Sequence, residues 1–170
     1  MPGIPVNPTV LKELQRQLNQ ELSASHDYLS LAVWCANANL KGFARFFKQQ
    51  AAEEREHADK FMDHLLSRGQ LPEIGAVKAP RGEFNSIQEA AKHAQAMEQK
   101  NTVGVNSAYE AAVRENDLPA QVMLQWFISE QVEEEDWADE MVDRVQHAQS
   151  PGGLAQLDRH IERILREEDN

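Results

Sequence analysis

Apolar residues recur at three- and four-residue intervals along almost the whole chain, and this spacing is the strongest constraint on its fold. Alternation of apolar and polar residues, as in half-buried strands, is scarce. Residues three or four apart lie on one face of an α-helix, so the pattern predicts an all-α protein. Four long helices are expected over residues 8–36, 41–68, 87–115 and 119–147, with a short fifth helix over 152–166.

Turn and capping residues predict how these helices are connected. Asn7 and Pro8 are typical of the cap and first turn of a helix, and Ser86 and Glu89 have the spacing of a capping box. Short turns make the first and second helices antiparallel, and likewise the third and fourth. The segment 70–85 has no helical period, and it is long enough to cross the length of a bundle. We therefore expect one domain over the whole chain, a four-helix bundle with one long crossover and a short fifth helix.

Each of the four apolar stripes is interrupted near its middle by a glutamate on the side that should face the core. These residues are Glu21, Glu54, Glu98 and Glu134. Burying one ionised carboxylate costs several kcal/mol, and four together would also repel one another. The total would offset a net domain stability of roughly 5–15 kcal/mol. The pattern therefore predicts either protonated carboxyl groups or bound cations.

One histidine stands at the level of these carboxylates. His57 follows Glu54 by three residues, so both side chains lie on one helix face and can reach one ion. A lone histidine near a core face is more often structural, but the neighbouring carboxylates favour a metal ligand here. Oxygen ligands with one imidazole suit iron, manganese or zinc. In the second half of the chain, Trp137 stands where a second such histidine would be, and Gln131 lies one turn before Glu134.

Charge and hydropathy exclude several classes of protein. The chain has 28 acidic and 17 basic residues, a formal net charge of −11, which argues against nucleic-acid binding and against a basic membrane-binding patch. No apolar run approaches the roughly 20 residues of a membrane span, and no signal peptide is visible. A single cysteine excludes an intrachain disulfide. We expect a cytoplasmic protein with neither nucleic-acid nor membrane partners.

Three stretches resemble the ferritins, specifically the haem-free prokaryotic type. They are residues 20–28 (QELSASHDY), 52–57 (AEEREH) and 125–135 (QWFISEQVEEE), within a resemblance that runs from about Asn7 to Leu165. The resemblance implies a four-helix bundle with a short fifth helix, and a hollow shell of twenty-four subunits that stores ferric mineral. It also implies ferroxidase activity, in which O2 or hydrogen peroxide oxidises Fe(II).

The resemblance also implies roles for individual residues. A diiron centre would be held by Glu21, Glu54, His57, Glu98 and Glu134, with Glu54 bridging the two ions and Gln131 close by. A third iron site would be formed by Glu53, Glu130 and Glu133. Tyr28 matches the tyrosine beside the diiron centre and is expected to donate an electron.

Other positions depart from related families, and two further functions stay open. Arg55 stands where bacterioferritins carry a haem-ligating methionine, so no haem is expected. Gln121 and Leu124 replace the acidic residues of the threefold channel of animal ferritins, which leaves the route of iron into a shell open. One alternative is a diiron oxygenase or peroxide-reducing enzyme, although such enzymes more often have two Glu-x-x-His motifs. The other is an acidic helical interaction protein whose glutamates face solvent.

Overall fold

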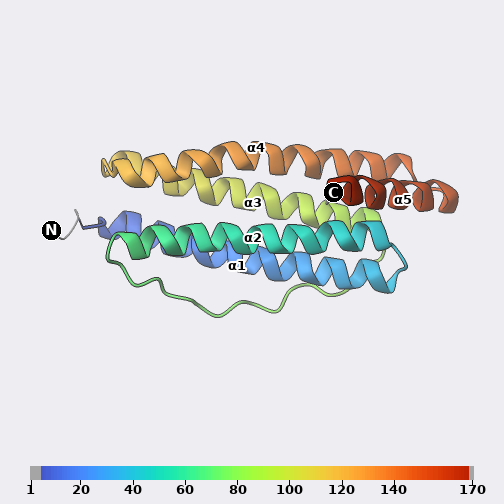
Figure 1. Cartoon of the computed structure of the whole chain (residues 1–170), viewed down its shortest axis with the longest axis horizontal. Coiled ribbons are helices and arrows are strands. Elements are labelled where there is room, and N and C mark those ends of the chain that lie inside the picture. The colour runs from blue at the N-terminus through green and yellow to red at the C-terminus, as the bar shows by residue number, and fades with distance from the viewer. Residues whose placement is uncertain (1–4, 169–170) are drawn as a thin grey trace.

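The computed structural model describes residues 5–168, which form five helices and no strand (Figure 1). The four long helices are α1 (Pro8–Asn37), α2 (Lys41–Ser67), α3 (Ile87–Arg114) and α4 (Leu118–His147). The fifth, α5 (Pro151–Glu168), folds back along the bundle from the end of α4 (Figure 1). The predicted all-α bundle with a short fifth helix is confirmed.

Side-chain caps begin three of the long helices. The Asn7 side chain accepts a hydrogen bond from the Thr9 amide at 2.8 Å, and Asp117 accepts one from the Ala120 amide at 3.1 Å. Ser86 accepts from the Glu89 amide at 3.2 Å. These caps satisfy amide groups that have no partner within the helix, which is why the helices begin where short polar residues occur.

The long crossover runs along the outside of the bundle, as the green trace between α2 and α3 shows (Figure 1). Asn19 of α1 accepts a hydrogen bond from the Gly75 amide at 2.7 Å and donates one to the Glu73 carbonyl at 2.9 Å. Further along α1, the Ser30 hydroxyl donates to the Arg81 carbonyl at 2.8 Å. Because α1 binds the crossover at both of these levels, the segment spans the bundle without a helix of its own.

The apolar core is divided into two clusters by a polar layer. One cluster contains Tyr28, Phe43 and Phe47, and the other contains Leu14 and Phe61. Along α1 and α2 the change from one cluster to the other falls at the predicted glutamates. The two clusters stabilise the bundle, and the layer between them is therefore the part of the core that needs another explanation.

The position of α5 is determined by a close contact with the start of α2. The buried Asp158 accepts a hydrogen bond from the Phe43 amide at 3.0 Å. A Cβ atom added to Gly42 would lie 2.0 Å from the Asp158 carbonyl oxygen, so only glycine allows this approach. No helix among residues 5–168 is both long and apolar enough to cross a membrane.

Candidate metal centre

The structure brings the four core glutamates and His57 together, with one glutamate from each long helix. Their exposed fractions are 0% for Glu21, Glu54 and Glu98 and 3% for Glu134 and His57. Each residue lies on the stripe that packs its helix into the bundle, so the same periodicity that buries the leucines also buries these side chains. Four carboxyl groups and an imidazole therefore share one layer of the core.

His57 lies between two groups of candidate metal ligands. Glu21, Glu54 and His57 each offer one ligand atom, and these atoms all lie within 4.8 Å of one another. His57, Glu130 and Glu134 form a second group by the same criterion. The Nδ1 atom of His57 is 3.3 Å from Glu54 Oε2 and 3.7 Å from Glu21 Oε2, whereas its Nε2 atom is 4.0 Å from Glu130 Oε1.

Neutral donors hold three of the four buried carboxylates. Glu21 Oε1 accepts from the Gln17 amide at 2.8 Å, and Glu134 Oε2 accepts from the Trp137 indole. Glu98 accepts from the Tyr28 hydroxyl and, at 3.3 Å, from the Gln131 amide.

Glu54 differs from the other three carboxylates because no amide, hydroxyl or indole among residues 5–168 donates to it, and the His57 ring lies 3.3 Å from its Oε2 atom. Its Oε1 atom has no partner, and neither does the Oε2 atom of Glu21. Buried polar atoms are nearly always hydrogen-bonded, so two unpartnered carboxylate oxygens beside one imidazole are unusual. A cation between them would supply the missing partner.

The carboxyl groups of this layer differ in how readily they lose a proton. Burial and the negative charge of Glu21 raise the pKa of Glu54 well above its ordinary value. Burial and the charge of Glu98 raise the pKa of Glu134 to about 8. Burial also raises the pKa of Glu98, although the Tyr28 hydrogen bond opposes this change. Without a cation, this layer therefore holds protons that a bound metal ion would displace.

Glu21 and His57 form the charged part of the layer. Burial acts to raise the pKa of Glu21, but its interactions with His57 and Glu54 bring it below its ordinary value. Burial acts to lower the pKa of His57, but its interaction with Glu21 raises it overall. The two groups stabilise one another as an ion pair when no metal is bound.

Tyr28 lies against the layer from the apolar side. Its ring stacks on Phe47, with the ring centroids 6.0 Å apart, and its centroid is 6.1 Å from that of Trp137. Burial and the charge of Glu98 raise the pKa of Tyr28 well above its ordinary value. The side chain is therefore a protonated phenol whose hydroxyl donates to Glu98.

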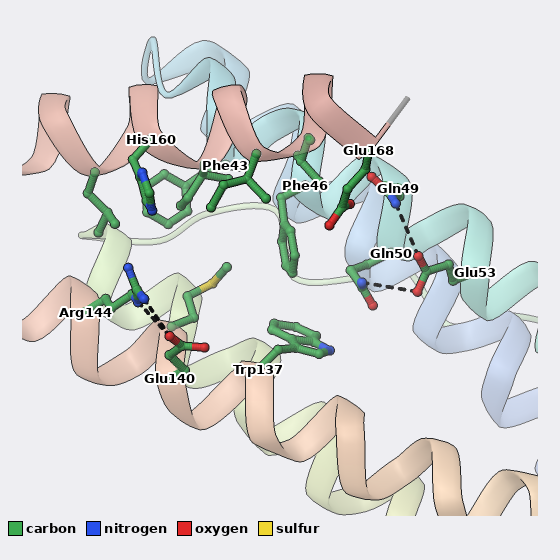
Figure 2. A pocket seen from close by; sticks show the side chains of 15 residues that line it. Phe43, Phe46, Gln49, Gln50, Glu53, Trp137, Glu140, Arg144, His160 and Glu168 are labelled. Carbon is green, nitrogen blue, oxygen red and sulfur yellow. Dashed lines mark hydrogen bonds and ion pairs between the residues drawn. The ribbon is translucent and has the colours of Figure 1, made fainter. Parts of the chain in front are cut away.

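The residues of the expected third site are only partly brought together. Glu130 belongs to the group around His57, but neither group contains Glu53 or Glu133. Glu53 is partly buried, and its carboxylate accepts hydrogen bonds from Gln50 at 3.3 Å and Gln49 at 3.5 Å (Figure 2). Glu133 is exposed on α4. A third ion would therefore require side chains of this set to change position.

A cavity of about 310 Å³ lies beside the carboxylate layer, between α2, α4 and α5. Phe43, Phe46 and Trp137 contribute to its lining, and Glu53 lies at its other side (Figure 2). Trp137 lines this cavity and also donates to Glu134, so its indole separates the cavity from the buried carboxylates.

Sequence reasoning missed two contributions to this layer. The sequence places Trp137 where a second histidine would be, but it did not predict that the Trp137 indole donates a hydrogen bond to Glu134. Gln17 was not singled out, although it lies four residues before Glu21 and therefore on the same helix face. That spacing was the available signal, because an amide one turn from a buried carboxylate can donate to it.

The long crossover, the short fifth helix and the buried layer of carboxylates with one imidazole define a ferritin-like bundle. The model of the ferritin-like domain family matches residues 11–148. A bacterial non-heme ferritin of Staphylococcus haemolyticus is 39% identical over 134 residues, which are 79% of this chain and 81% of that protein. One from Escherichia coli is 32% identical over 157 residues, covering 92% of this chain and 95% of that protein.

A solved structure agrees with these sequence matches. The open-pore ferritin of the hyperthermophilic archaeon Archaeoglobus fulgidus superimposes with a TM-score of 0.90 at 31% identity, covering 92% of this chain and 98% of that one. The chain belongs to the ferritin family. Its similarity to bacterial non-heme ferritins confirms the resemblance that the sequence motifs indicated.

Proposed function

We propose that this protein stores iron in the cytoplasm as one ferritin-like domain that assembles into a shell of twenty-four copies. Fe(II) would be oxidised at the buried carboxylate layer and deposited as Fe(III) mineral inside the shell. The observation that carries this proposal is a pair of fully buried carboxylate oxygens without a hydrogen-bond partner. These atoms are Glu21 Oε2 and Glu54 Oε1, and both residues lie beside the His57 ring. Membership of the ferritin family supports the same function.

The first ion would be bound by Glu21, Glu54 and His57, and the second by Glu54, Glu98 and Glu134. Bridging by Glu54 is supported by its lack of a neutral donor, which leaves its carboxylate available to both ions. Binding of the ions would release the protons that these carboxyl groups hold. Each Fe(II) then gives up one electron, and O2 takes up two electrons and two protons to form hydrogen peroxide. If peroxide is the oxidant, it takes up two electrons and two protons to form water.

Tyr28 and Gln131 would act through Glu98. The Gln131 amide donates to Glu98 Oε2 at 3.3 Å and to the Glu98 carbonyl at 3.2 Å, so it restricts the rotation of that carboxylate. The Tyr28 hydroxyl donates to the other oxygen and is close enough to the centre to supply an electron. Glu53, Glu130 and Glu133 would bind a third ion or pass Fe(III) towards the interior, with Glu130 beside His57 as the first step.

The two alternative functions are less well supported. An interaction protein whose four core glutamates face solvent is wrong, because all four are buried. A diiron oxygenase or peroxidase retains its metal ions as a cofactor, which a second imidazole would favour. Here the corresponding residue is Trp137, whose indole nitrogen donates a hydrogen bond and offers no lone pair to a metal.

The test measures the rate of Fe(II) oxidation in air together with the native mass of the assembled protein. Twenty-four chains of 19.3 kDa correspond to roughly half a megadalton. We expect such a particle, rapid oxidation, and anomalous scattering from iron at the buried layer in iron-soaked crystals. A monomer or dimer that oxidises Fe(II) no faster than buffer would contradict the proposal.

A further inference from the structure

Gln17 is a polar side chain at a core position of α1, with an exposed fraction of 0%. Its Nε2 atom donates to Glu21 Oε1 at 2.8 Å, one helical turn further along. A buried amide costs free energy unless it is hydrogen-bonded, so an apolar side chain would serve the packing of α1 equally well. The choice of glutamine points to a role in the neighbouring carboxylate layer.

The orientation of the Gln17 amide is determined by Arg16. Arg16 Nη1 donates to Gln17 Oε1 at 3.1 Å, while its Nη2 atom donates to Glu13 and to the Gly104 carbonyl, each at 2.8 Å. A guanidinium group is only a donor, so the amide atom that faces it must be the oxygen. The amide nitrogen of Gln17 is thereby directed at Glu21.

Gly104 provides the space for this amide. It is buried within α3, where glycine costs roughly 1 kcal/mol relative to alanine. A Cβ atom at this position would lie 2.1 Å from Gln17 Oε1 and 3.0 Å from Arg16 Nη1. One contact therefore accounts for both the glutamine in the core of α1 and the glycine within α3, because the glutamine amide occupies the space that a larger residue on α3 would fill.

This contact affects only one oxygen of Glu21. Its Oε1 atom is held by Gln17, whereas its Oε2 atom has no hydrogen-bond partner and lies 3.7 Å from His57 Nδ1. We propose that Gln17 is a positioning residue which, oriented by Arg16 and accommodated by Gly104, directs Glu21 Oε2 alone towards the first metal ion. This inference rests on the proposed function, because it assigns the support of one ligand of that site.

The experiment compares Gln17→Leu and Gly104→Ala with the wild-type assembled protein. Gln17→Leu removes the donor at nearly constant size, and Gly104→Ala displaces the amide without changing any polar group. Gly152→Ala is the matched control, because nothing lies within 4 Å of the added Cβ atom there. Co(II), which does not react with air as Fe(II) does, is titrated by calorimetry, and the visible spectrum of the bound ion reports its coordination.

Loss of groups that orient metal ligands weakens metal binding by about 10–100-fold. We expect both variants to raise the Kd of the tightest Co(II) site by about tenfold or more and to change the spectrum of that ion, with Gly152→Ala unchanged. A purely structural role would lower thermal stability and leave the spectrum of the bound ion as in the wild type.

Wild-type affinity and spectrum in either folded variant would overturn the inference. If Gln17→Leu does not fold, the Co(II) affinity and the spectrum of the bound ion in Gly104→Ala test the inference, since that variant retains the glutamine. A wild-type protein that binds no Co(II) and oxidises no Fe(II) would overturn the proposed function and this inference with it. A wild type that does both, with variants that match it, would overturn the role of Gln17 alone.

Discussion

The two halves of the carboxylate layer have the same helical spacing, but the residue three positions after the glutamate differs in whether it can bind a metal ion. In the α1–α2 half, His57 follows Glu54 by three residues and faces Glu21 through Nδ1. In the α3–α4 half, Trp137 follows Glu134 by three residues and donates its indole hydrogen to that carboxylate. An imidazole can bind a metal ion, whereas an indole only donates. Because Trp137 stands at the position that matches His57, the ligand atoms that the α3–α4 half can offer a metal ion are all oxygens.

The pKa values of the layer reflect the position of the imidazole beside Glu21. Interaction with His57 and Glu54 brings the pKa of Glu21 below its ordinary value although burial acts to raise it. Burial raises the pKa of Glu98 and Glu134, and at Glu134 the charge of His57 opposes this change without reversing it. Burial and the charge of Glu21 also raise the pKa of Glu54 in the α1–α2 half. Glu21 is therefore ready to accept a cation, whereas Glu54, Glu98 and Glu134 must first release protons.

The largest effect is expected from Glu54→Ala, which removes the one carboxylate that serves both halves. We expect the rate of Fe(II) oxidation to fall by about 100-fold or more, because removal of a direct ligand exceeds the 10–100-fold loss typical of its supporting groups. Absorbance of the ferric product, followed by stopped flow, measures the rate. Glu56→Ala, an exposed glutamate of the same helix, is the control and should match the wild type. Equal rates for the two variants would contradict the assignment.

The comparison between the halves is tested next by His57→Ala. Loss of the only imidazole of the layer should weaken binding of the first ion by about 100-fold and leave the all-oxygen half as the tighter site. Anaerobic Fe(II) titration by calorimetry would show this change as loss of the tightest binding step. Retention of that step would show that His57 is a structural residue.

Trp137→Phe tests the other half with a smaller change. The phenyl ring retains most of the apolar packing but cannot donate to Glu134, so we expect binding of the second ion to weaken by about tenfold. Trp137→His should have the opposite effect, because a second imidazole makes the two halves alike. Retention of metal after gel filtration separates the two results, and identical retention in both variants would refute the comparison.

The proton content of the α3–α4 half predicts the pH dependence of stability. The pKa of Glu134 is about 8 in the folded protein against an ordinary value of 4.5. Between these values the native state binds more protons than the unfolded chain, so the free energy of unfolding of the metal-free protein falls as pH rises. This one group contributes at most about 1.4 kcal/mol per pH unit.

Denaturant unfolding of the metal-free protein between pH 5 and 8 measures this slope. Glu134→Gln should reduce it, because an amide does not titrate in this range. Glu133→Gln changes the same charge at an exposed neighbouring position and should retain the wild-type slope. A stability that rises with pH in the wild type would show that the carboxyl groups of this layer are ionised without metal.

The smallest effect concerns α5, which is bound to α2 and leaves a cavity of about 310 Å³ beside α4. Asp158→Ala removes the carboxylate that caps the Phe43 amide at the start of α2. Loss of such a cap costs about 1 kcal/mol, which thermal unfolding of the variant would detect. Asp143→Ala, an exposed position on α4, is the control. No loss of stability would mean that α5 is held by its apolar face alone.

The fold was largely predictable because its determinants are local. Asn7, Ser86 and Asp117 cap the helices that they precede, and the three- and four-residue spacing identifies the buried face of each helix. The burial of Glu21 and its counterparts followed from the same periodicity. Their roles as iron ligands remain predictions, as does the third site, for which only Glu130 lies in a ligand group with His57.

The sequence by itself therefore determined the five helices, their buried faces and the set of carboxylates at one level of the core, since all of these depend on hydrogen bonds and periodicity within single helices. Only the tertiary structure decided which oxygen of each carboxylate is held and which is left for a cation. Gln17 and Gly104 lie on different helices and are distant in sequence, and their contact depends on how α1 and α3 approach one another. Such side-chain geometry is set by packing between helices, which no local pattern records.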